Sequence, residues 1–228
     1  HVEYNPNFTG FLRNLESVDG AGRKLFSFSQ HETEVIKRIL NICVQSRRAD
    51  VHKFAKQAFP QVDSPRTLIK YCQEAGIDRI KLGYYRVGEF GSLARRLDEV
   101  RRQLELVVEL AAKYGVRPCV HVHSGGTIPS SGMMLYGLLK GIEPERVGAY
   151  LDSHHMTITG GNGGWSQAID LLKPWISLVA LKNFQWRKGE RGELGQQRWG
   201  TEYCRLEDGV APIAEFVGTV QRAGYGGF

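Results

Sequence analysis

The stretch AAKYGVRPCVHVHSGG, residues 111–126, joins the end of a helix to a strand and a polar loop. It closes the amphipathic segment 92–115, whose apolar residues recur at the spacing of one helix face. Gly115 is predicted to end that helix, and the apolar run 117–123 reads as a strand. Because residues two apart on a strand point to the same side, His121 and His123 are expected to project together before the Ser-Gly-Gly loop.

The same order of segments recurs along the chain. Helices are predicted over 31–48, 64–76, 92–115, 131–142, 164–175 and 209–225. Strands are predicted over 2–4, 50–56, 78–84, 117–123, 147–152 and 176–182. Strands that alternate with helices form a parallel sheet covered by helices, as an open doubly wound sheet or as a (β/α)₈ barrel.

Several features favour the barrel. No G-x-G-x-x-G follows a predicted strand, which disfavours a dinucleotide site. The chain begins within a predicted strand and stops at GYGGF, where another strand is expected. We therefore predict one α/β domain over residues 1–228, a (β/α)₈ TIM barrel that is incomplete at both termini. Strand 1 with its helix and strand 8 are the units expected to be missing.

Composition, with 42% hydrophobic and 24% charged residues, is ordinary for a globular fold of the size of an enzyme. The net charge of +6 is weak evidence for an anionic partner, because Arg and Lys alternate with acidic residues on helical segments. No apolar run approaches the ~18 residues of a membrane span. The four cysteines, at 43, 72, 119 and 204, form no C-x-x-C pair. Reduced core thiols, and hence a cytoplasmic location, are predicted.

Polar side chains follow four successive predicted strands, at the edge where parallel α/β folds place their active sites. They are Lys81, Tyr84, Tyr85 and Arg86, then His121, His123 and Ser124, then Asp152, His154 and His155, and then Lys182, Asn183, Phe184 and Trp186. A lone strand histidine is ordinarily a hydrogen-bonded core residue, but two on one side suit a divalent metal. With Asp152 and the following loop residue His155, the set suits metal binding or acid–base chemistry.

Three features each have two interpretations. Lys182 faces a developing enolate or other anion, or pairs structurally with Asp152. Trp186, in the long polar stretch 184–207, stacks on a sugar ring or holds the stretch in place. The sequence GGNGGW, 160–165, is a mobile loop near a ligand or a plain flexible loop.

The run from residue 111 through VGAYLDSHHMTITGG and ISLVALKNFQW to CRLEDGVAPIAEFVGTVQRAGYGGF resembles the sugar phosphate isomerase/epimerase group. These proteins are xylose isomerase-like TIM barrels related to endonuclease IV. The resemblance covers about residues 64–228 and, in layout alone, the part before. The strongest matches are Asp152 with His155, as the family's Asp-x-x-His, and Lys182 with Asn183, where the family has Lys-Asp.

The resemblance implies a barrel with one divalent ion, Mn, Mg, Co or Zn, held by Glu, Asp, His and Glu at the ends of strands 5 to 8. Classical members isomerise or epimerise keto-sugars through an enediolate, with two glutamates as acid and base. Here His121 stands in place of the strand-5 Glu and Ala180 in place of the strand-7 His, and the strand-8 Glu would lie beyond Phe228. We therefore predict a metal set of His121, Asp152 and His155, which Ala180 leaves short of a donor.

The leading prediction is a sugar or sugar-phosphate isomerase or epimerase of carbohydrate metabolism that uses metal-assisted proton transfer. His121, His155 and Lys182 are predicted to be catalytic, and Lys81, His123 and Trp186 to bind substrate. The expected partner is a small carbohydrate, with no nucleic acid or membrane partner and with homo-oligomerisation left open. The alternatives are a lyase or dehydratase acting on a keto-sugar or keto-inositol, and a non-catalytic sugar-binding barrel. A repair endonuclease is disfavoured, because the ligands of a three-metal cluster are missing.

Overall fold

A computed structural model describes residues 65–74 and 76–227. The chain divides into two compact units, His1–Ser64 and Pro65–Phe228, and every element below belongs to the second. The helix predicted over 31–48, the strands predicted over 2–4 and 50–56, and Cys43 lie outside the described residues.

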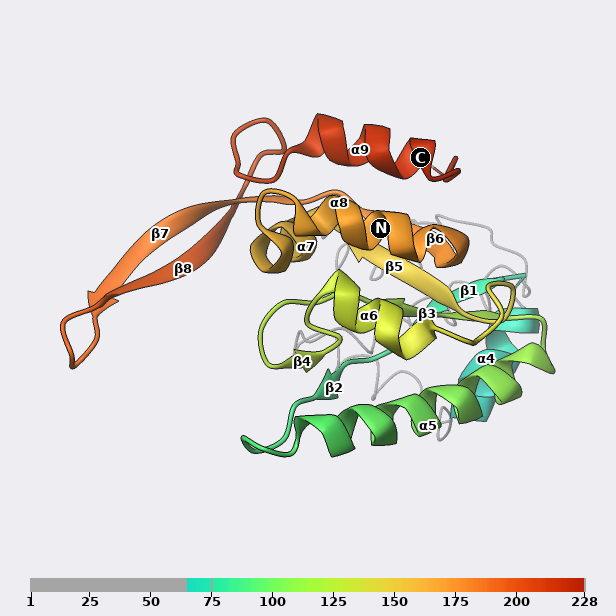
Figure 1. The fold of residues 1–228 in the computed structure, drawn as a ribbon. Coiled ribbons are helices and arrows are strands. Elements are labelled where there is room, and N and C mark those ends of the chain that lie inside the picture. The colour runs from blue at the N-terminus through green and yellow to red at the C-terminus, as the bar shows by residue number, and fades with distance from the viewer. Residues whose placement is uncertain (1–64, 75, 228) are drawn as a thin grey trace, which may run out of the picture. The chain divides into compact units, whose positions relative to one another are not determined.

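Four parallel strands form the central sheet (Figure 1). They are β1 (Arg79–Lys81), β3 (Arg117–His121), β5 (Gly148–Asp152) and β6 (Ile176–Ala180). Their order in the sheet, β1-β3-β5-β6, is their order in the chain. A TIM barrel is wound in this way, whereas the strand order of an open doubly wound sheet reverses at a switch point. The sheet thus consists of consecutive barrel strands. Each of them is shorter than the strand that the sequence predicts at the same place.

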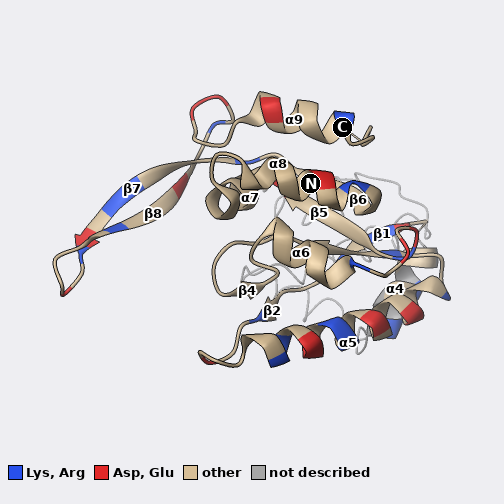
Figure 2. Ribbon diagram, in the orientation of Figure 1, with Lys and Arg blue, Asp and Glu red and all other residues tan. Residues whose placement is uncertain are grey.

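Helices cover the outside of this sheet in chain order (Figure 1). They are α4 (Pro65–Glu74), α5 (Leu93–Ala112), α6 (Gly132–Leu139), α8 (Gly164–Leu172) with the 3₁₀ turn η1 (Lys173–Trp175), and α9 (Ile213–Arg222). Helix α5 buries Val100, Leu104 and Val108, which recur every four residues. Its solvent face carries charges of both signs (Figure 2), including Arg101, which donates to Glu105 at 2.7 Å.

The core lies between the sheet and the helices. Leu104 of α5, Leu151 of β5 and Phe216 of α9 are fully buried members of one apolar cluster. Packing is close enough to require glycine at the start of β5, because a Cβ on Gly148 would lie 2.5 Å from Ser177 Oγ. The predicted core thiols Cys72 and Cys119 are buried and free. Burial raises the pKa of Cys72 to about 11 and that of Cys119 to about 12.

Two segments differ from the sequence predictions. His155 was expected in a loop, but residues Ser153–Gly160 form a short helix, α7, directly after β5. The polar stretch 184–207 was not expected to contain strands, but β7 (Asn183–Arg191) and β8 (Gln197–Cys204) pair as a long antiparallel hairpin. This hairpin, the arm, projects from the sheet and helices of its unit (Figure 1).

Smaller features complete the unit. Strands β2 (Tyr85–Arg86) and β4 (Thr127–Ile128) pair antiparallel, beyond the carboxyl ends of β1 and β3. Within the described residues, no helix has the length and apolar character that a bilayer crossing would need.

Candidate functional site

The carboxyl ends of three neighbouring strands meet at one place. His121 ends β3, Asp152 ends β5 and Ala180 ends β6. In the parallel ladder His121 pairs with Tyr150, and Asp152 pairs with Ala180. Tyr150 and Asp152 lie two residues apart on β5, so their side chains point to the same face of the sheet. His121 is level with Tyr150, and the side chains of His121 and Asp152 therefore lie near each other at the carboxyl edge of the sheet.

Asp152 is fully buried and begins helix α7. Its Oδ1 accepts hydrogen bonds from the backbone N–H groups of His154 at 3.0 Å and His155 at 3.2 Å. This is the capping role for which aspartate is preferred at a helix start, because the first N–H groups have no partner within the helix. The cap turns the chain so that His155 returns over the carboxylate.

Positively charged and hydrogen-donating groups surround the other oxygen of Asp152, Oδ2. Lys182 Nζ lies 2.7 Å from Oδ2, His121 Nε2 lies 3.1 Å from it, and His155 Nε2 lies 4.0 Å from it. Burial alone would raise the pKa of the Asp152 carboxyl, but the hydrogen bond from His121 and the charge of Lys182 outweigh burial and hold that pKa well below its usual range. Asp152 is therefore an anion at neutral pH.

His121 is held from both sides. Asp152 can only accept, so His121 Nε2 must donate to it, and Nδ1 then accepts from the hydroxyl of Tyr84 at 3.0 Å. The ring is 5% exposed, and burial lowers its pKa despite the opposing carboxylate. His121 is thus a neutral imidazole in a Tyr84–His121–Asp152 chain of hydrogen bonds.

The ring of His155 makes fewer hydrogen bonds than that of His121. Its Nδ1 shares a hydrogen bond of 2.9 Å with the Ser124 hydroxyl, and its Nε2 is beyond hydrogen-bond distance of Asp152. Burial lowers the pKa of His155 to about 3, against the raising effect of the Asp152 charge. The ring centroids of His123 and His155 lie 4.0 Å apart, and those of His121 and His123, which were predicted to project together, lie 5.9 Å apart.

Lys182 is positioned through its backbone. Ser153, next to Asp152, donates from its hydroxyl to the Lys182 carbonyl at 2.6 Å and accepts from the Lys182 N–H at 2.8 Å. These bonds fix the chain just beyond β6, from which the side chain reaches Asp152. Lys81, at the end of β1, lies at the same edge of the sheet, with its Nζ 4.1 Å from the ring centroid of Tyr84.

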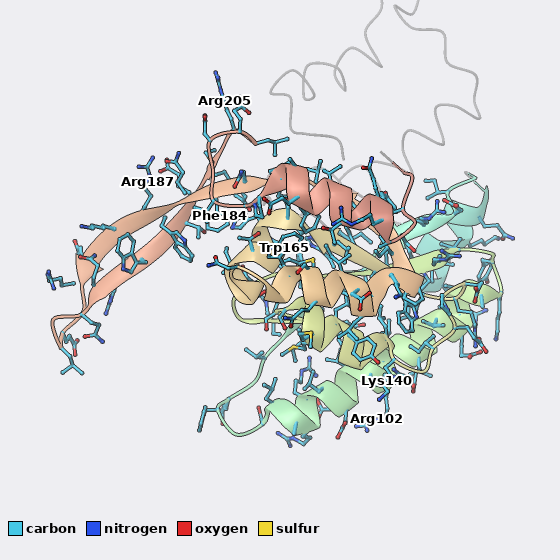
Figure 3. The ribbon with its side chains drawn as sticks, turned by 45° about the horizontal axis from the view of Figure 1, so that its top comes forward. Arg102, Lys140, Trp165, Phe184, Arg187 and Arg205 are labelled. Atoms are coloured by element: carbon cyan, nitrogen blue, oxygen red, sulfur yellow. The ribbon has the colours of Figure 1, made fainter. Side chains whose placement is uncertain are left out.

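Trp186 lies apart from this cluster, on the arm, but is linked to it by a series of stacked and edge-to-face ring contacts. The ring of His155 stacks on that of His154 at 4.6 Å, and His154 stacks on Phe184 at 4.7 Å. Phe184 contacts Trp186 at 5.4 Å. Figure 3 shows Phe184 at the base of the arm and Arg187 farther out. An aromatic series therefore runs from the cluster onto the arm, where Trp186 is 44% exposed.

The structure therefore places six of the seven predicted site residues in one cluster and Trp186 apart from it, on the arm. Sequence reasoning assigned no role to Ser153 or Tyr150 and singled out Tyr84 only as a strand-end residue. Ser153 follows the strand-end aspartate, and a serine at that place is a detectable signal for an anchoring hydroxyl. The ring of Tyr150 lies 4.4 Å from that of His121, a contact between strands that the sequence does not reveal.

The predicted metal set does not form a metal-binding group. In the part of the chain that the structure describes, no three His, Cys, Asp or Glu side chains are placed to hold a metal ion. Lys182 Nζ already contacts Asp152 Oδ2 at 2.7 Å, and both ring nitrogens of His121 are hydrogen-bonded. Ala180 brings no donor atom. The residues as placed do not fit a divalent ion, and no chemical step is assigned to one.

Two cavities lie away from this cluster. One of about 520 Å³ is lined by Arg79, Ile176 and Tyr225, among others, and one of about 310 Å³ by Asp78, Arg117 and Glu145, among others. Both therefore border the amino ends of the strands, opposite the edge where barrel enzymes carry out their chemistry. The candidate site is accordingly defined by its interacting side chains and not by these cavities.

Known structures share this fold. A D-tagatose 3-epimerase-like protein has 21% identity and a TM-score of 0.54, with 81% of this chain and 64% of that one covered. The probable 3-DHS dehydratase AsbF from Bacillus anthracis has 17% identity and a TM-score of 0.56, with 84% and 73% covered. The IOLI protein, solved with a zinc atom, has 12% identity and a TM-score of 0.57, with 83% and 69% covered. At these identities the likeness concerns the fold.

The chain spans less than two thirds of the length of the D-tagatose 3-epimerase-like protein. No curated protein matches the sequence. The family model of the xylose isomerase-like TIM barrel matches residues 56–228, which include every element described above. With its parallel strands in barrel order and its polar cluster at their carboxyl ends, the chain belongs to the xylose isomerase-like TIM barrel family.

Proposed function

We propose that this protein is an isomerase or epimerase that moves a proton at a carbon next to the carbonyl group of a small sugar or sugar derivative. The observation that carries the proposal is the contact of Lys182 Nζ with the buried Asp152 carboxylate at 2.7 Å, with the imidazoles of His121 and His155 beside the same oxygen. Removal of such a proton needs a base and a positive group for the developing enolate oxygen. The cluster contains both types of group.

His155 is the proposed base. When its Nδ1 donates to Ser124, its Nε2 carries the free lone pair that accepts a proton from carbon. The Asp152 carboxylate, 4.0 Å away, favours the imidazolium that forms and opposes the burial that lowers the pKa of His155. His121 differs, because both of its nitrogens are engaged. It therefore orients Asp152 and relays protons with Tyr84 in this proposal.

Lys182 is the proposed electrophilic group. Its side chain is 26% exposed, so the ammonium can reach a ligand while it remains paired with Asp152. A positive charge of this kind stabilises the enolate oxygen without a change of protonation state. Lys81 and His123, at the same edge of the sheet, are proposed to bind substrate hydroxyl groups, and Trp186 on the arm is proposed to stack on the sugar ring.

Deuterium exchange tests the proposal. A panel of ketoses and keto-inositols is incubated with the protein in D₂O, and proton NMR follows the hydrogen next to the carbonyl group. We expect exchange with formation of an epimer or isomer. His155→Gln should slow the reaction about 10²–10⁴-fold, as for loss of a general base. Exchange at the wild-type rate in that variant would remove His155 from the proposed role.

The same experiment separates the alternatives. A lyase or dehydratase forms the same enolate and then loses a leaving group, so it yields an unsaturated product. A sugar-binding barrel would bind a ketose without exchange or elimination. Lys173→Ala is the matched control for lysine variants, because Lys173 lies on η1, is exposed and, within the described part of the chain, has its one ion pair with Asp170 at 3.2 Å.

A further inference from the structure

We propose that the ammonium group of Lys182 is a built-in cation that takes the place of a divalent metal ion against Asp152. The protein would therefore bind no divalent ion at this carboxylate. Members of this fold do hold metal, as the zinc-bound IOLI protein illustrates. The inference concerns metal binding and does not rest on the proposed reaction.

The first argument is the number of acceptor positions on Asp152. A carboxylate offers about four lone-pair positions for hydrogen bonds or metal coordination. Two on Oδ1 are used by the N–H groups of His154 and His155. Two on Oδ2 are used by Lys182 Nζ and His121 Nε2. A metal ion could coordinate Asp152 only by displacing a donor that is already in place.

The second argument is that Lys182 is anchored on both sides of its Cα atom. Ser153 bonds to both its N–H and its carbonyl group. The next residue, Asn183, is buried and donates from Nδ2 to the carbonyl groups of Leu206 at 2.6 Å and Ala211 at 3.1 Å. The backbone therefore directs this lysine toward Asp152, so the ammonium is a fixed part of the site and not a mobile surface charge.

The third argument is charge. The buried Asp152 carboxylate needs compensation, and one ammonium at 2.7 Å supplies a single positive charge. A divalent ion at the same oxygen would add two more positive charges within a few ångströms of Lys182, in surroundings of low dielectric constant. Ala180, level with Asp152 on the neighbouring strand, has no donor that could offset this repulsion. With its ammonium 2.7 Å from Oδ2 and no donor at position 180, Lys182 therefore competes with a divalent ion for Asp152.

Cobalt titration tests the inference. The full chain is freed of metal and titrated with Co²⁺, with visible absorption and calorimetry as readouts and elemental analysis of the protein as isolated. We expect no Co²⁺ bound by wild type at Asp152. We expect Lys182→Ala to bind one Co²⁺ per chain, because one acceptor position on Asp152 Oδ2 is then open and His155 Nε2 lies 4.0 Å from that oxygen. Lys173→Ala should behave as wild type, and Asp152→Asn added to Lys182→Ala should abolish the gained binding.

Either of two results would overturn the inference. One is stoichiometric Co²⁺ binding by wild type that Asp152→Asn removes. The other is a folded Lys182→Ala variant, checked by circular dichroism, that binds no Co²⁺. Should that variant fail to fold, the wild-type titration decides. Failure here is distinguishable from failure of the proposed reaction, because a metal-binding protein can still exchange the ketose proton and a metal-free one can lack that activity.

Discussion

Ser153 and Lys182 exchange two hydrogen bonds, one in each direction, between the start of α7 and the end of β6. The Ser153 hydroxyl is the only link among the described contacts that satisfies both backbone groups of Lys182. Because Ser153 directly follows Asp152, the same link sets the distance between the ammonium and the carboxylate.

We expect Ser153→Ala to lower the free energy of unfolding by about 1–3 kcal/mol, because two partly buried backbone groups lose their partner. Urea unfolding measures this loss. Ser166→Ala is the control, since the Ser166 hydroxyl bonds only to the Gly163 carbonyl at 2.8 Å near the start of α8. An equal loss in both variants would contradict the special role of Ser153.

Asn183 is predicted to need its amide. Its Oδ1 accepts from the N–H groups of Phe184 at 2.9 Å and Ala211 at 2.7 Å, while its Nδ2 donates to two carbonyl groups. Asn183→Asp would place a carboxylate oxygen against those carbonyls, so we expect unfolding free energy to fall by more than about 1–3 kcal/mol.

The matched control is Gln185→Glu, since Gln185 makes one exposed bond, to the Asp208 carbonyl at 3.0 Å. Thermal unfolding of both variants provides the comparison. An Asn183→Asp protein as stable as Gln185→Glu would show that the hydrogen bonds of the Asn183 amide are dispensable. The Asn183 amide also requires glycine at position 209, because a Cβ there would lie 2.1 Å from Asn183 Oδ1.

Stability should depend on pH through His155. Its pKa falls from 6.5 to about 3 in the folded protein, so between these values the unfolded chain binds more protons. The contribution of neutral His155 to the free energy of unfolding is therefore fully present above pH 6.5. It is lost as the pH falls, by about 1.4 kcal/mol per pH unit for this one group.

Chemical unfolding between pH 4.5 and 6.5 measures this slope, above the range in which Asp152 begins to be protonated in the unfolded chain. We expect His155→Gln to reduce the slope by about one proton, with the remainder due to His121 and His154, whose pKa values are also lowered by burial. An unchanged slope in His155→Gln would show that His155 is not a neutral buried group.

Trp186 is predicted to affect substrate affinity and not turnover. Its exposed ring continues the aromatic series from His155 along the arm, at a distance from the reacting groups. We expect Trp186→Ala to raise KM about 2–10-fold with little change in kcat, as for loss of one stacking contact.

Trp199→Ala is the control for that prediction. Trp199 lies on β8 opposite Lys188, farther along the arm, and its ring is 5.8 Å from Lys188 Nζ. A smaller effect on KM is expected there. If both variants left KM unchanged, the arm would have no part in substrate binding.

The regular elements were predictable because each has a local signal. The apolar period of α5 and the glycine at 115 mark one helix and its end, and the structure confirms a helix over Leu93–Ala112. The apolar runs that predict β3 and β5 are buried on both faces, as parallel strands are, and the run that predicts β6 is partly buried. Helix α7 had no such signal, because its first five residues are buried on all sides and show no helical period.

The arm was not predictable for the opposite reason. Beyond Phe184 most of its residues are exposed, so its strands lack the alternation of apolar and polar residues that marks a half-buried strand. Its pairing depends on cross-strand contacts such as the ion pair of Arg187 with Glu202. Such contacts join residues from separate strands and have no periodic trace in the sequence.

The sequence by itself determined the barrel units and which strand ends carry His121, Asp152 and Lys182, because strand periodicity and chain order are local properties. Only the tertiary structure decided what these groups do to one another. Lys182 and Asp152 come from separate strands, so their contact depends on the parallel register and on Ser153. That contact places an ammonium beside Asp152, where the family resemblance predicted a metal ion. The sequence could not reveal this, because the distance between two side chains and their competition for one oxygen depend on three-dimensional packing.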